Sequence, residues 1–120
     1  MAGFQKGPPT IPGVRHHNED YVVPFAKSVK AGDGTTRVLF YQNTLINFPQ
    51  SRLNLTVPEE LLLHDRRGRL VYLGGCGCHH ACPNHTIYDH SKPEMRRMWV
   101  NNIVEVVRAN PGLVDGTMPQ

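Results

Sequence analysis

The cysteines of this chain are gathered in one short segment that also holds most of its histidines. All three cysteines and four of the seven histidines fall in the run GGCGCHHACPNHTIYDH, from Gly74 to His90. Thiolates and imidazoles are the ligands that zinc prefers, usually four of them in a tetrahedron. Sulfur ligands argue against magnesium and calcium, which bind oxygen. The segment therefore predicts a zinc site.

The predicted zinc ligands lie within ten residues of one another: Cys76, Cys78, Cys82 and His85. Classical zinc fingers divide their ligands into two distant pairs, so four ligands this close together make an unusually tight loop. The identity of the fourth ligand therefore stays open. The local substitutes for His85 are His80 and His90, and the remote ones are His16, His17 and His64.

The surrounding residues favour a structural metal over a catalytic one. A closed shell of four protein ligands leaves no coordination position for a reacting water molecule. A zinc deaminase also needs a glutamate close to its ligating histidine, and no glutamate lies between Glu60 and Glu94. We therefore expect a non-catalytic protein, and a metal-dependent enzyme is the less favoured alternative.

The ligand order Cys-x-Cys followed by Cys-x-x-His is similar to the ligand set of CDGSH-type iron–sulfur proteins, which has three cysteines and one histidine. The resemblance implies a [2Fe–2S] cluster as the alternative cofactor and a redox role as an alternative function. It covers residues 76–85 only. The central spacing is shorter here, and Cys82-Pro-Asn-His85 stands where the family has C-D-G-x-H. We infer no family membership.

Five arginines stand near this segment in the sequence. Arg66, Arg67 and Arg69 fall at the tip of a predicted hairpin, and Arg96 and Arg97 fall at the start of a predicted helix. The planar guanidinium group makes paired hydrogen bonds with phosphate. If the zinc loop brings the two groups together, they form one basic patch suited to nucleic acid. The competing interpretation is that both groups are simply solvated.

The main functional prediction is therefore a zinc-binding interaction module that contacts nucleic acid. The alternative is a structural or accessory subunit of a large complex with protein partners only. The net charge of +3 is mildly basic, less than dedicated nucleic-acid binders usually carry. No apolar run resembles a secretory signal or a membrane span. We expect a soluble intracellular protein, in the cytoplasm or nucleus, with no membrane partner, and we infer no small-molecule substrate.

A length of 120 residues corresponds to about one domain. We expect an extended N-terminal arm over residues 1–19, where proline, glycine and histidine are frequent. A single zinc-stapled domain follows over residues 20–112, and residues 113–120 form a short tail. The predicted fold class is α+β, with a small, mainly antiparallel sheet of two hairpins, then the metal-binding loop and one C-terminal amphipathic helix.

The first predicted hairpin pairs strands at 21–29 and 37–43 around an Asp33-Gly34 turn. Residues 52–57 alternate between apolar and polar and predict a half-buried strand. The second hairpin turns at Asp65–Gly68, where Gly68 supplies a positive φ. A short helix over residues 58–64 is the alternative to its first strand.

The C-terminal helix carries the clearest start and stop signals. Ser91-Lys92-Pro93-Glu94 has the pattern of a capping box, which predicts a helix that begins at Ser91. Asn110-Pro111-Gly112 ends it. Apolar and small polar residues recur between them at helical spacing: Met95, Met98, Trp99, Asn102, Ile103 and Val106.

Overall fold

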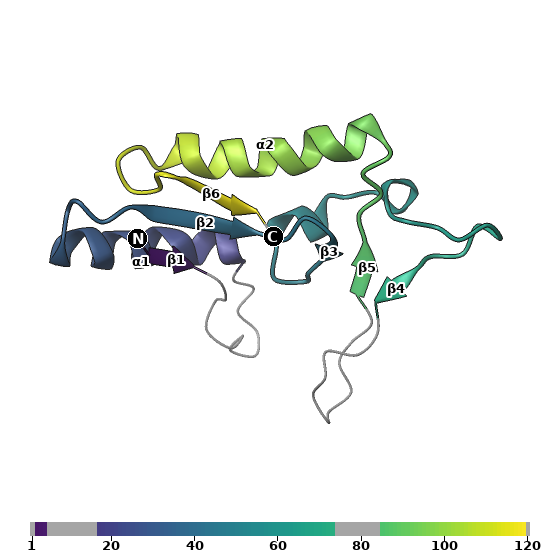
Figure 1. Cartoon of the computed structure of the whole chain (residues 1–120), viewed down its shortest axis with the longest axis horizontal. Helices are drawn as coiled ribbons and strands as arrows, with labels where there is room; N and C mark the ends of the chain where they lie inside the picture. Colours follow the sequence, from purple (N-terminus) through teal and green to yellow (C-terminus); the bar gives the residue numbers. More distant parts are fainter. Residues whose placement is uncertain (1, 5–16, 74–84, 120) are drawn as a thin grey trace, which may run out of the picture.

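The computed structural model describes residues 2–4, 17–73 and 85–119. It contains two helices, α1 (Asn18–Gly32) and α2 (Pro93–Ala109), and two single-turn 3₁₀ helices, η1 (Arg52–Leu55) and η2 (Glu59–Leu61). The strands are β1 (Ala2–Phe4), β2 (Val38–Gln42), β3 (Ile46–Asn47), β4 (Tyr72–Leu73), β5 (His85–Ile87) and β6 (Gly116–Pro119). The α+β class is confirmed (Figure 1).

The strands form two separate sheets of opposite character. One has the order β1-β2-β6 and is parallel throughout, with Phe40 beside Phe4 and Thr117. The other has the order β3-β5-β4 and is antiparallel. The expectation of one mainly antiparallel sheet was therefore only partly right. Short turn signals in the sequence favour hairpins, which pair neighbouring strands, whereas β2 and β6 are distant in the chain and joined through a helix, as parallel strands must be.

The segment predicted as the first strand is helix α1, so the first hairpin is wrong. Val22 and Ala26 lie four residues apart and are both fully buried on one face of this helix. Pro24 costs the helix one backbone hydrogen bond, but the buried face compensates for it. The predicted strand at 37–43 is confirmed as β2, and it pairs with β1 and β6 instead.

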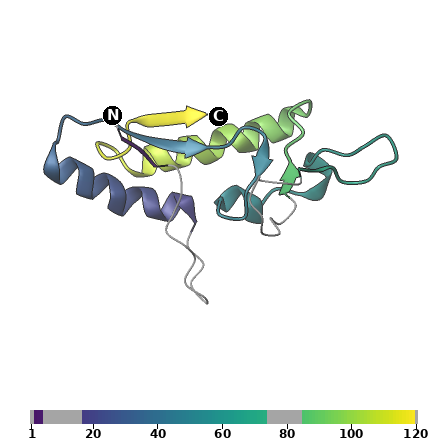
Figure 2. The same cartoon turned by 60° about the horizontal axis from the view of Figure 1, so that its bottom comes forward.

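Both helices pack on the same face of β2. Val22 and Ala26 of α1 meet Val38 and Phe40 of β2, together with Val106 of α2, in one buried cluster. Figure 2 shows α1 and α2 on the same side of the parallel strands. The alternate residues of β2, Leu39 and Tyr41, are only half-buried on the opposite face, against which neither α1 nor α2 packs. We call this the helix-free face, with reference to the described residues.

The strand predicted at 52–57 is wrong, because residues 52–55 form η1. The Ser51 hydroxyl accepts a hydrogen bond from the Leu53 amide at 3.3 Å, which starts the turn. Only Leu53 is buried, in a second cluster with Leu61, Leu62, Tyr88 and Met95. The exposed fraction of Leu55 is 57%. An alternating pattern predicts a strand only when a sheet is present to bury one face.

The second hairpin is confirmed in outline. The Asp65 amide bonds the Arg69 carbonyl at 2.8 Å and Gly68 has a φ of 75°, as the turn requires. The bridge between His64 and Leu70 continues the pairing toward β4. The alternative of a short helix over residues 58–64 survives only as the single turn of η2.

The N-cap of helix α2 lies one residue after Ser91, which is the N-cap that the capping box predicts. The observed N-cap is Lys92, Pro93 occupies the first helical position, and no side chain caps the amides. The Ser91 hydroxyl instead donates to the Asp89 carboxylate at 2.6 Å. The helix ends before Asn110, as predicted.

Residues 116–119, within the predicted tail, form β6. In the part of the chain that the structure describes, no helix is long and apolar enough to cross a membrane.

Candidate functional site

The antiparallel sheet determines where the cysteine segment is anchored. Leu73 of β4 is paired with His85 of β5, so residues 74–84 connect two adjacent antiparallel strands. The predicted ligands Cys76, Cys78 and Cys82 and the substitute His80 lie outside the described residues. His85 is the only member of the primary ligand set whose surroundings are described.

The imidazole of His85 is positioned by packing against a described side chain, and no described residue bonds its nitrogens. Its ring lies edge-on to the ring of Phe48, with centroids 5.0 Å apart. The side chain is half-buried, and neither ring nitrogen bonds any described residue. An imidazole nitrogen without a hydrogen-bond partner can bind a metal.

The other described histidines are held differently. The Nε2 atom of His90 bonds the carbonyl oxygen of Thr44, and its ring packs edge-on to Trp99 with centroids 6.2 Å apart. The Nδ1 atom of His64 bonds the Leu62 carbonyl at 2.8 Å. His17 is the N-cap of α1, and its buried Nδ1 atom has no hydrogen-bond partner among the described residues.

Within residues 2–4, 17–73 and 85–119, no group of three or more histidine, cysteine, aspartate or glutamate side chains could hold a metal ion. In the described part of the chain, no histidine therefore has enough neighbouring ligands to complete a metal site. A site built on His85 needs further ligands from residues outside the described ranges, such as the cysteine segment and His16.

The first arginine group lies on a projecting turn. The Asp65 carboxylate accepts hydrogen bonds from the amides of Arg67 and Arg69, at 2.8 and 3.0 Å, and an ion pair with the Arg69 guanidinium at 2.9 Å. These backbone bonds hold the pKa of Asp65 below its ordinary value, so the carboxylate stays charged. Arg66 and Arg67 are exposed, with no ion pair to a described residue.

The second group, at the start of α2, is on a different element. The Arg96 guanidinium donates to the carbonyl oxygens of His90 and Ser91, which fastens the turn before the helix. Arg97 is exposed. In Figures 1 and 2 the segment around residues 65–69 extends beyond the rest of the fold, away from the start of α2. The two groups therefore do not form the single basic patch that the sequence suggests. Of the five predicted arginines, Arg66, Arg67 and Arg97 are exposed, and their guanidinium groups make no hydrogen bond or ion pair with a described side chain.

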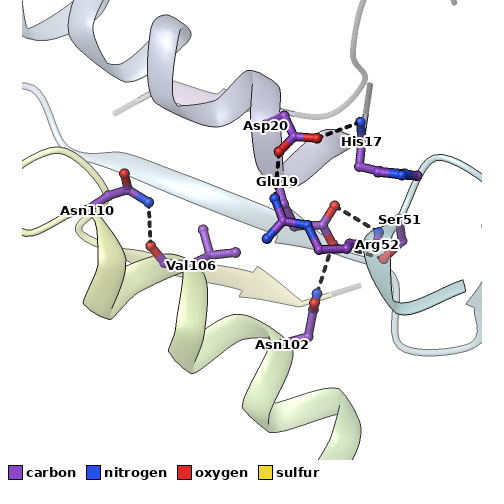
Figure 3. Close-up of polar contacts among 8 residues, drawn as sticks. All are labelled: His17, Glu19, Asp20, Ser51, Arg52, Asn102, Val106 and Asn110. Carbon is purple, nitrogen blue, oxygen red and sulfur yellow. Dashed lines mark hydrogen bonds and ion pairs between the residues drawn. The ribbon is translucent and has the colours of Figure 1, made fainter. Parts of the chain in front are cut away.

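The structure also contains a buried polar cluster that the sequence analysis missed, shown in Figure 3. Glu19, with an exposed fraction of 4%, accepts hydrogen bonds from the Ser51 hydroxyl at 3.1 Å, the Arg52 amide at 2.9 Å and the Asn102 side chain at 2.9 Å. Asn102 also donates to the Gln42 side chain at 2.6 Å. The cluster joins α1, β2, η1 and α2.

Glu19 lies in the first turn of α1 and not in the extended arm predicted over residues 1–19, where prolines and glycines outweigh the signal for a helix. The available signal was the pair Glu19-Asp20 directly before apolar residues at helical spacing, which is typical of a helix N-terminus. Asp20 receives the His17 amide at 3.1 Å and pairs with the Arg52 guanidinium at 2.6 Å.

Searches for relatives add no identification: no known family model matches the chain, and no curated protein is significantly similar to it.

Proposed function

We propose that this chain is a non-catalytic interaction module that binds zinc and contacts nucleic acid. In this proposal zinc is held by Cys76, Cys78, Cys82 and His85. A [2Fe–2S] cluster on the same ligands is the alternative cofactor. The proposed nucleic-acid contacts come from two separate arginine groups, of which Arg69 and Arg96 also stabilise local structure: Arg66, Arg67 and Arg69 on the projecting turn, and Arg96 and Arg97 at the start of α2.

The observation that supports the zinc site best is the state of His85. Its imidazole has no hydrogen-bond partner among the described residues, whereas His64 and His90 each have one ring nitrogen bonded to a carbonyl oxygen and only the other left for a metal. Because β4 and β5 pair, His85 also stands where the cysteine segment rejoins the sheet. This arrangement favours His85 over His90 as the fourth ligand.

Metal analysis of the purified chain tests the zinc proposal. We expect one zinc per chain, lost in His85→Ala and retained in His64→Ala, the matched control. Cys82→Ser should also lose zinc. If this variant does not fold, cobalt substitution of the wild-type chain gives a second readout, because thiolate-to-cobalt absorption shows that cysteines bind the metal. A metal-free, stable wild-type chain would contradict the proposal, and an iron- and sulfide-containing chain would favour the cluster.

The nucleic-acid contact is tested separately. We expect the double variant Arg66→Ala/Arg67→Ala to weaken oligonucleotide binding and to reduce the salt slope by roughly 2, about one unit for each lost phosphate contact. The control is Arg108→Ala, an exposed arginine in the last turn of α2. Equal binding by the double variant would remove the arginine surface from the proposal.

One observation favours the second candidate, a subunit of a larger assembly with protein partners. Parallel sheets are almost always covered on both faces, yet α1 and α2 cover only one face of β2. Leu39 and Tyr41 of β2 and Met118 of β6 are half-buried on or beside the other face. If the arginine variants bind oligonucleotides unchanged, this candidate takes first place.

A further inference from the structure

We draw no further inference here: the strongest candidate, the half-buried helix-free face formed by Leu39 and Tyr41 of β2 and Met118 of β6, carries none, because nothing in the described structure shows what covers it.

Discussion

The two halves of this molecule are stabilised in different ways. In the helical half, α1, β2, β6 and the end of α2 surround a cluster of fully buried side chains that includes Val22, Val38 and Phe40. In the loop half, short strands and two 3₁₀ turns surround a second buried cluster that includes Leu53, Tyr88 and Met95. The turns of this half are completed by hydrogen bonds to the side chains of Asp65 and Asp89. The candidate metal ligand and the projecting arginines belong to the loop half.

This difference shows how a small chain can separate stability from surface chemistry. In the helical half, the backbone groups of the helices and strands bond one another, so the side chains there are free to pack in the core. Segments in the loop half have few ladder bonds, so aspartates complete their turns and exposed positions stay free for charged residues. The polar cluster around Glu19 connects the halves, since it bonds both η1 and α2.

The largest expected effect is in the helical core. Phe40→Ala removes a side chain that is 1% exposed and should lower the free energy of unfolding by about 3–5 kcal/mol. The matched control is Leu39→Ala, the next residue on the same strand, which faces away from the helices and should cost clearly less. Urea unfolding measures both. Equal costs would mean that the helix-free face is as well packed as the core.

The next effect tests the connection between the halves. Glu19→Gln places an amide group among three hydrogen-bond donors, so at least one buried donor loses its acceptor, at a cost of about 1–3 kcal/mol. Asp20→Asn, one residue away at an exposed ion pair, should cost less than about 1 kcal/mol. Thermal unfolding of both variants measures the two losses of stability. An equal loss in both would mean that the buried Glu19 carboxylate stabilises the fold no more than the exposed Asp20 does.

A smaller effect distinguishes the two explanations for the start of α2. A capping box would make Ser91→Ala cost about 1 kcal/mol. Since Asp89 accepts from both the Ser91 amide and its hydroxyl, we expect Asp89→Ala to cost about 1 kcal/mol and Ser91→Ala less than half of that. Stability curves of the two variants make the comparison, and the reverse order would restore Ser91 as the cap.

The smallest effect is a pH dependence at the turn after α1. Hydrogen bonds from the Thr35 hydroxyl, the Thr35 amide and the Thr36 hydroxyl hold the pKa of Asp33 at about 2, below its ordinary 3.8. The unfolded chain therefore binds this proton more readily, so the stabilisation is complete above pH 3.8 and is lost as the pH falls toward 2. Melting temperatures from pH 2 to 5 should rise less steeply in Asp33→Asn than in wild type.

The local signals in the sequence predicted the local structure well. Asp65-Arg66-Arg67-Gly68 predicted the turn, with Gly68 at positive φ. Asn110-Pro111-Gly112 predicted the end of α2. The helical spacing of Met95, Ile103 and Val106 predicted its buried face. Each of these features depends on residues close together in the chain, so composition and spacing were sufficient.

Only the tertiary structure decided which elements meet. The run at 21–29 suits a strand or a helix, and burial of Val22 and Ala26 against β2 selected the helix. Residues 52–57 alternate as a strand should, but Ser51 and Glu19 bond their first amides and turn them into η1. The parallel pairing of β2 with β6 joins residues about 77 apart in the chain, a distance over which no local pattern carries information.

The candidate site shows the same division. The sequence alone predicts a metal site at the cluster of cysteines and histidines, because the preference for a metal depends on the types of the ligand residues. It could not choose between His85 and His90. The difference lies in partners distant in the sequence: His90 bonds the carbonyl of Thr44 and packs on Trp99, whereas the His85 ring meets Phe48 and keeps its nitrogens unbonded within the described structure. Long-range contacts are fixed by the fold, so only the fold shows that the two histidines have different surroundings. That His85 and not His90 binds the metal stays a prediction.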